Sequence, residues 1–192
     1  MTTMYANLGK DPNLIWVGLS YTLSTAVCIT FVGRLSDIFG RRMVMIAGAT
    51  LGVVGSIVGA TSHNISGLIG ATTIIGIAAS SQLSYYYILG ELVPMKYRFL
   101  ANAIVYLMEI PSLALAPVIS NSFLIHYPSV GWRGNYYLLI ALNAVAWICW
   151  VLFYHPPTFH MKHRNDSVWK FIKNFDYVGT ILYTGGLVSL AT

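Results

Sequence analysis

Long apolar runs alternate with short charged segments along the whole chain. Apart from Glu109, the apolar runs contain no Asp, Glu, Lys or Arg. The first five are each long enough to cross a hydrocarbon core about 30 Å thick at about 1.5 Å per residue, and the last is a few residues shorter. Because lipid offers no partner to an unpaired backbone group, each run is predicted to be a helix. We therefore predict an all-α, multi-pass transmembrane helix bundle over residues 1–192, with spans at 14–32, 43–61, 66–90, 99–121, 136–154 and 177–192.

Composition and charge fit this pattern. Hydrophobic residues make up 56% of the chain and charged residues 9%, against about 25% charged in soluble domains. The net charge of +5 does not indicate a nucleic-acid partner, because its carriers lie in loops between apolar spans. All but two of the 11 basic residues fall on one side, which is predicted to be cytoplasmic. That side carries Arg34, Arg41, Arg42, Lys96, Arg98, Lys162, Arg164, Lys170 and Lys173, and the other carries Lys10 and Arg133.

The charged segment between the first two spans is the most informative part of the sequence. Residues 33–42 read G-R-L-S-D-I-F-G-R-R. Glycine at both 33 and 40 permits a sharp turn. Asp37 stands among three arginines, close enough for charge-assisted hydrogen bonds. The segment is therefore predicted to be a tight cytoplasmic loop.

The pattern G-x-L-x-D-x-x-G-R-R resembles the signature loop between the second and third helices of major facilitator superfamily transporters. The resemblance implies a partial major facilitator fold, about helices two to seven, with a preceding helix and a second half outside this sequence. It also implies that the loop braces the cytoplasmic face in one state and loosens in the other. The arginines could instead serve only as positive-inside anchors. The motif residues are Gly33, Arg34, Leu35, Asp37, Gly40, Arg41 and Arg42.

Two further segments are similar to one fungal branch of that superfamily. They are residues 91–98, E-L-V-P-M-K-Y-R, and residues 154–159, Y-H-P-P-T-F. That branch holds trichothecene-type toxin efflux pumps and siderophore transporters. The resemblance implies alternating-access transport of a small organic molecule across the plasma membrane, with toxin or drug export ahead of iron–siderophore uptake. The alternative is a truncated, non-transporting membrane fragment with only a structural or regulatory role in helix packing.

Glu109 is the acid deepest within a span. It follows Arg98 by about 16 Å of helix, which places it near the bilayer midplane. A charge there is costly and usually faces a cavity or a partner. Asn102 lies on the same helical stripe, so both are candidates for the transport path, and Glu109 is also a candidate proton carrier. Glu109 could equally have a purely structural role, either protonated or hydrogen-bonded to a neighbouring helix.

Other predicted spans contain small and polar residues that are candidates for the transport path or for contacts between helices. Gln82 could line a substrate path or could bond between helices. Pro117 lies in a segment, residues 112–121, similar to the glycine-rich antiporter motif of helix five, and the proline is expected to bend that helix. Thr72 stands where drug–proton antiporters often carry arginine. A glycine face for close helix packing is formed by Gly48, Gly52, Gly55 and Gly59.

No catalytic constellation, phosphate loop or metal site is recognised, so the chain is expected not to be an enzyme and to need no cofactor. His155, His160 and His163 fit a basic loop near anionic headgroups better than a metal site. Cys28 and Cys149 are expected to be small buried residues. The expected partners are the lipid bilayer, a small-molecule substrate, protons as the candidate coupling ion, and the missing helices of a full-length transporter; nucleic acid is not among them.

Overall fold

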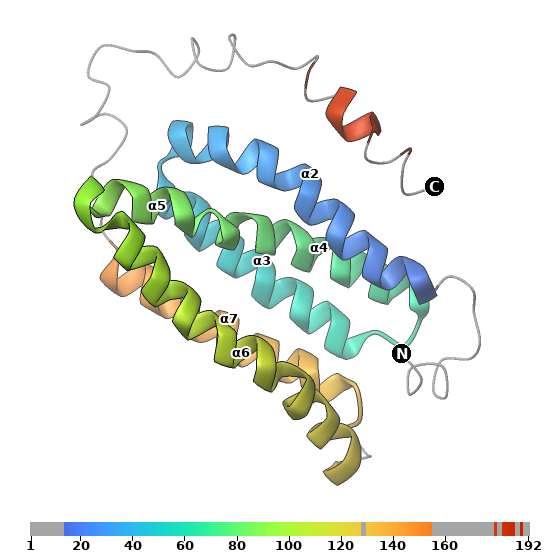
Figure 1. Cartoon of the computed structure of the whole chain (residues 1–192). Helices are drawn as coiled ribbons and strands as arrows, with labels where there is room; N and C mark the ends of the chain where they lie inside the picture. The colour runs from blue at the N-terminus through green and yellow to red at the C-terminus, as the bar shows by residue number, and fades with distance from the viewer. Residues whose placement is uncertain (1–13, 128–129, 155–178, 180–181, 187–188, 190–192) are drawn as a thin grey trace.

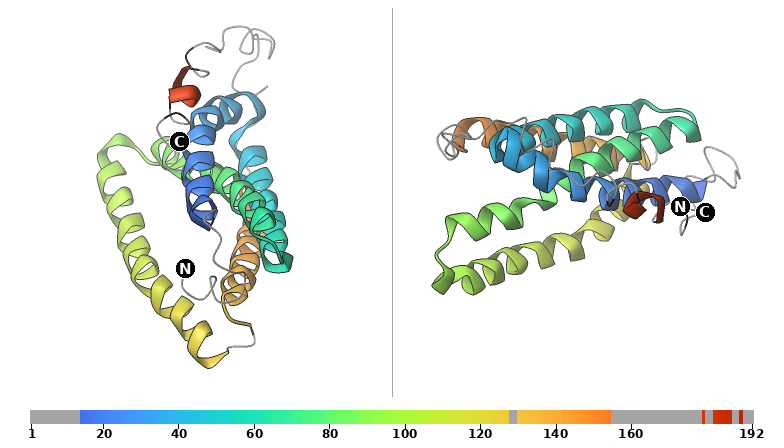
Figure 2. Two further views of the ribbon diagram at one scale, coloured as in Figure 1. Left: turned by 90° about the vertical axis from the view of Figure 1, so that its right-hand side faces the viewer. Right: turned by 90° about the horizontal axis from the view of Figure 1, so that it is seen from above.

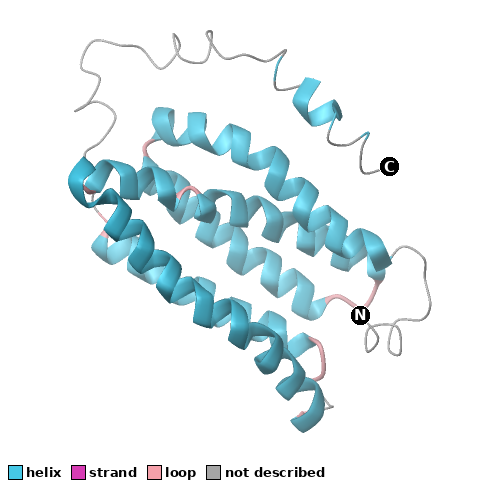
Figure 3. Cartoon of the chain, in the orientation of Figure 1, coloured by secondary structure: helices cyan, strands magenta, loops and turns pink. Residues whose placement is uncertain are grey.

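The computed structural model describes residues 14–154 except 128–129, and after them only 179, 182–186 and 189. Every element in this part of the chain is helical (Figure 3). Five helical segments are long and apolar enough to cross a membrane, which confirms the predicted helix bundle with five complete spans. Most of the predicted sixth span, 177–192, lies outside the described residues. The elements are α2 (Ile15–Phe39), α3 (Arg41–Thr61), α4 (Ile65–Leu83), α5 (Tyr85–Leu92), η2 (Met95–Tyr97), α6 (Arg98–His126) and α7 (Arg133–Phe153).

Four helices form the packed part of the bundle. Helix α4 packs against both α2 and α3, and α3 packs on its other side against α7 (Figure 1). Helix α6 stands apart from this group, as Figure 2 shows, and none of its residues is buried. It meets α5 at one end and α7 at the other. The long middle of α6 is therefore the least enclosed transmembrane segment of the described chain.

The glycine face of α3 allows its close packing. All four glycines are buried, and a Cβ added at each would collide with a neighbouring helix. Gly48 and Gly55 face α4, at Ser81 and at the pair Ile74 and Ile75, whereas Gly52 and Gly59 face α7, at Asn143 and Tyr136. The prediction of glycine-mediated packing is confirmed, and the structure adds that the stripe divides between two partner helices.

The predicted extracytoplasmic end of the bundle holds a compact apolar cluster. Leu14 and Leu68 are fully buried there, and the rings of Trp132 and Tyr136 meet edge to face with centroids 5.8 Å apart. Arg133 donates from Nη2 to the Ser62 carbonyl at 3.2 Å. The starts of α2, α4 and α7 and the end of α3 are thereby tied together.

The outer surface of the bundle is strongly apolar. Phe99 is 87% exposed, Met95 82% and Phe153 81%, and many Leu, Ile and Val side chains on α3, α6 and α7 also face outward. Soluble monomers rarely expose contiguous apolar surface on this scale, whereas lipid is a good solvent for it. The surface indicates an integral multi-pass membrane protein.

The third predicted span, 66–90, is two helices rather than one. Helix α4 ends at Leu83 and α5 begins at Tyr85, with Ser84 at φ −70° and ψ 1° between them. The hydroxyls of Ser80, Ser81 and Ser84 each donate to the carbonyl three residues earlier in the chain. Such back-bonding competes with regular helix hydrogen bonds and favours a bend.

Candidate functional site

The signature segment is almost entirely helical, which corrects the predicted loop. Helix α2 continues through Gly33 to Phe39, and α3 begins at Arg41. Gly40 alone separates them, with φ 88°. An L side chain rarely adopts that angle, so glycine is required there. Gly33 does not form a turn, because charged residues can leave the membrane within a continuing helix and no proline interrupts this one.

Arg42 connects the start of α3 to the end of α7. Its Nη2 donates to the carbonyl oxygen of Val151 at 2.9 Å, and α7 ends two residues later at Phe153. Carbonyl groups in the last turn of a helix lack intrahelical partners, and a cation there also complements the helix dipole. Arg42 is therefore more than a positive-inside anchor in this structure.

The structure describes the side chains of some of the other signature-motif residues but not of all of them. Arg41 is partly buried at the first position of α3, and Leu35 is 41% exposed on α2. The side chains of Arg34 and Asp37 lie outside the described part of the structure. The expected contacts of Asp37 with the arginines, and the gating role of the motif, stay predictions.

Glu109 lies on α6 beside a pair of tyrosines. Tyr106 precedes it by one turn, and the ring of Tyr86 on α5 lies 6.1 Å from the ring of Tyr106. The Oε2 atom of Glu109 is shielded from solvent and has no hydrogen-bond partner among the described residues. Asn102 is partly buried two turns before Glu109 on the same helix.

That group of residues has defined chemical capabilities. A carboxyl group can carry a proton or accept a hydrogen bond, depending on its protonation state. The two phenols can donate hydrogen bonds to ligand oxygens, and their rings offer apolar faces. The carboxyl and the two phenols are therefore groups that can exchange hydrogen bonds or protons.

Gln82 takes part in a bond between helices. Its Nε2 donates to Oδ1 of Asn143 on α7 at 2.7 Å. Asn143 in turn donates from Nδ2 to the Leu139 carbonyl at 2.9 Å. Asn143 lies directly over Gly52 of α3. Of the two roles left open for Gln82, the structure provides the interhelical bond.

Thr72 also bonds between helices. Its Oγ1 lies 2.8 Å from the hydroxyl of Ser20 on α2. One turn further, Thr25 donates to the backbone carbonyl of Gly76 at 3.1 Å. At the position where related antiporters often carry arginine, this chain has a hydroxyl that joins α2 to α4.

Pro117 lies within an unbroken helix. Helix α6 runs from Arg98 to His126 through both Pro111 and Pro117, and its ribbon curves gently in Figure 2. Ser120, one of the small residues that replace glycine in the antiporter-like segment, accepts a hydrogen bond from Nδ2 of Asn135 at 2.8 Å. The segment thus contributes to the junction between α6 and α7.

The described residues hold no group of three His, Cys, Asp or Glu that could bind a metal ion. His155, His160 and His163 lie outside them. Cys28 and Cys149 are both free, but Cys28 is only partly buried and Cys149 is exposed on α7, so the expectation that both are buried is wrong. Cysteine is apolar enough to face lipid as readily as a protein core.

Sequence reasoning missed three residues that matter for these contacts. Asn143 and Asn135 are polar residues of α7, and Tyr106 precedes Glu109 by one turn. An uncharged amide within an apolar span is a usable signal, since it needs a hydrogen-bond partner in lipid. The helical period gives the face on which such a residue lies but does not give the neighbouring helix that meets it.

The apolar surface and the five candidate spans are consistent with a partial helix bundle of the major facilitator type. Comparison with known families gives a match over residues 2–191 to the fungal trichothecene efflux pump (TRI12) family. The chain belongs to the fungal trichothecene efflux pump family.

Individual relatives agree with that assignment. The chain is 31% identical over 181 residues to a trichothecene efflux pump of Fusarium sporotrichioides, covering 94% of this chain and 30% of the relative. It is 30% identical over 187 residues to a trichothecene efflux pump of Trichoderma arundinaceum, with the same coverage. An MFS-type transporter of Penicillium citrinum is 28% identical over 194 residues, covering 99% of this chain and 32% of the relative. The chain therefore spans about a third of the length of these curated relatives.

Proposed function

We propose that this chain is part of a secondary transporter that exports small, largely apolar organic molecules of the trichothecene type. Family membership and the two trichothecene efflux pumps among its relatives support export. The family and these two relatives favour toxin export over iron–siderophore uptake. Transport would proceed by alternating access between two helix bundles, of which this chain supplies most of one, and the plasma membrane is the proposed location.

The observation that carries the proposal is the position of Glu109. An acid with a shielded oxygen and no hydrogen-bond partner among the described residues needs a partner in at least one state of the protein. A proton, a ligand hydroxyl or a group on another helix would each provide one. Because Tyr106 lies one turn before it on α6 and the ring of Tyr86 lies 6.1 Å from that of Tyr106, we assign Glu109 to substrate contact and proton coupling. Asn102 and Pro117 stay candidates for the transport path on the same helix.

An accumulation assay tests this assignment. The complete natural gene product is expressed in a trichothecene-sensitive yeast, and cell-associated radiolabelled trichothecene is measured as the external pH is raised. Cells with the natural protein should retain less toxin, and the difference should shrink as the inward proton gradient falls. Glu109→Gln should lose most of the export while reaching the membrane in normal amount. Glu109→Asp should retain part of it.

Ser122→Ala is the matched control. Ser122 lies more than three turns further along α6, outside the antiporter-like segment, is exposed, and donates its hydroxyl to the Val118 carbonyl of its own helix at 3.0 Å. Export with this variant should match the natural protein. If Glu109→Gln exports as well as Ser122→Ala with the same pH dependence, Glu109 does not couple transport to protons. If toxin retention never differs from that of cells without the protein, the chain fits the non-transporting alternative instead.

A further inference from the structure

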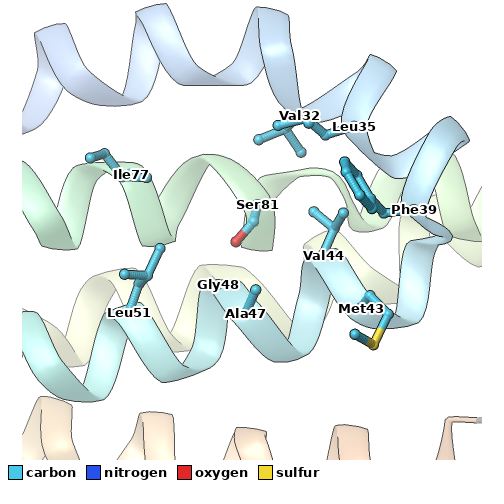
Figure 4. Close-up of a pocket in the computed structure, with 10 residues that line it drawn as sticks. All are labelled: Val32, Leu35, Phe39, Met43, Val44, Ala47, Gly48, Leu51, Ile77 and Ser81. Carbon is cyan, nitrogen blue, oxygen red and sulfur yellow. The ribbon is translucent and has the colours of Figure 1, made fainter. Parts of the chain in front are cut away.

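An apolar groove lies between α2 and α3 near the turn at Gly40 (Figure 4). Its volume is about 350 Å³. Helix α4 forms its floor, because α2 and α3 each pack closely on α4 but contact each other less. Ser81 is the polar side chain of the lining, and its hydroxyl donates to the Ala78 carbonyl of its own helix at 2.7 Å. The lining residues are Val32, Leu35, Phe39, Met43, Val44, Ala47, Gly48, Leu51, Ile77 and Ser81.

The groove opens to the outside of the described bundle. Phe39 is 60% exposed, Met43 63% and Leu51 40%, so its rim presents large apolar side chains to the surroundings. An occupant would therefore meet carbon on every side and find almost no hydrogen-bonding group. A polar solute finds no hydrogen-bond partner on such a surface, whereas a hydrocarbon chain can pack against it by van der Waals contact.

The length of the groove is comparable to the depth of one leaflet of the membrane. It runs along α3 from Met43 to Leu51, a rise of about 12 Å at about 1.5 Å per residue. That is somewhat less than half of a hydrocarbon core about 30 Å thick. The groove thus covers most of the depth of the predicted cytoplasmic leaflet, which is where an acyl chain of that leaflet lies.

The cytoplasmic end of the groove is basic. Arg41 is the first residue of α3, and it shares a helical face with Val44 and Gly48, which lie three and seven residues further along. Residues 33–42 contain three arginines and one acid, Asp37, and so carry a net positive charge. Lipids of the cytoplasmic leaflet are partly anionic, and basic residues at this depth attract their headgroups. A molecule with an anionic head and an apolar tail would therefore fit both the basic mouth and the apolar groove behind it.

We propose that the groove between α2 and α3 binds one acyl chain of an anionic phospholipid from the cytoplasmic leaflet, with the lipid phosphate near Arg41. The lipid would lie against both helices that Gly40 joins. Binding would thus depend on the relative position of α2 and α3. This site is separate from Glu109 and does not depend on what the protein transports.

Photolabelling tests the proposal. The complete natural gene product is placed in nanodiscs of phosphatidylcholine that contain phosphatidylserine with a diazirine on one acyl chain. After illumination, labelled residues are located by mass spectrometry. Label is expected on α3 between Met43 and Leu51. Ala47→Trp should fill the groove, because Ala47 is an exposed lining residue, and should reduce this label by about tenfold.

Val58→Trp is the matched control for the size of the added side chain. Val58 is 36% exposed on the same helix but lies beyond the groove, so its variant should label like the natural protein. Equal labelling of the Ala47→Trp and Val58→Trp variants would overturn the proposal. Crosslinks from the groove residues to another helix of the same protein, without lipid label, would also overturn it, because that helix would then be the occupant.

The charge of the headgroup is tested separately, with a variant that leaves the groove unfilled. Arg41→Gln should lower labelling by the phosphatidylserine probe by about fivefold, and Arg41→Lys should retain it. A phosphatidylcholine probe with the same diazirine chain should label all three proteins equally. If Arg41→Gln leaves the phosphatidylserine label unchanged, the anionic headgroup does not contribute and the proposal fails in that part.

Discussion

Gln82 of α4 and Asn143 of α7 are joined by a 2.7 Å hydrogen bond between their side-chain amides. The bond crosses over Gly52 of α3, where an added Cβ would lie 2.5 Å from Oδ1 of Asn143. Three helices that are far apart in sequence therefore meet at one amide pair within the apolar part of the bundle. Glycine at position 52 provides the space for the pair.

Breaking this amide pair should destabilise the protein. Gln82→Leu and Asn143→Leu each leave one amide without its partner, and hydrogen bonds between transmembrane helices contribute about 0.6 kcal/mol on average and about 1.7 kcal/mol at most. Thermal unfolding of the two single variants and the double variant in detergent would give the coupling energy. A positive coupling within that range is expected. Strictly additive losses would mean that the two amides do not stabilise each other.

Gly76 and Gly70, both on α4, form a matched pair of glycines. A Cβ at Gly76 would lie 2.7 Å from the backbone carbonyl oxygen of Tyr21 on α2, whereas a Cβ at Gly70 would meet nothing within 4 Å. Gly76→Ala should therefore force α2 and α4 apart and cost about 1–3 kcal/mol. Gly70→Ala should be neutral or slightly stabilising, because alanine favours helix. Differential scanning fluorimetry of the two variants compares them directly, and equal melting temperatures would contradict the close α2–α4 contact.

Substitutions at Gly40 and Gly33 test whether the signature segment is helical on both sides of Gly40. Gly40→Ala places a side chain at φ 88° and should cost about 1–2 kcal/mol. Gly33→Ala lies inside α2 with open space around it and should be tolerated. Both effects can be measured as shifts in thermal stability of the purified protein. Equal damage from the two substitutions would favour the loop that the sequence alone predicts.

The spans and the glycine packing could be predicted because each depends on a local, periodic property of the sequence. An uncharged run of sufficient length has few alternatives to a helix in lipid. The face shared by Gly48, Gly52, Gly55 and Gly59 follows from the helical period alone. Its division between α4 and α7 does not, because that depends on which helices lie beside α3 in three dimensions.

Three-dimensional contacts that a local sequence pattern does not contain also explain where the structure differs from the predicted loop and the predicted third span. The charges at residues 34–42 indicate where the chain meets water, but a helix can extend into water, so they do not fix where α2 ends. The break at Ser84 depends on serine back-bonding, which hydrophobicity does not report. The sequence places Glu109 at mid-span, whereas the pairing of Tyr86 with Tyr106, one turn before Glu109, depends on how α5 and α6 meet.

The most direct test of the account is transport by the complete natural gene product in sealed liposomes. The purified protein is reconstituted, a pH gradient is imposed, and movement of a radiolabelled trichothecene is measured with and without an agent that collapses the gradient. The account predicts gradient-dependent movement that Glu109→Gln greatly reduces and Ser122→Ala does not. Equal movement in liposomes with and without the protein, at every gradient, would contradict it.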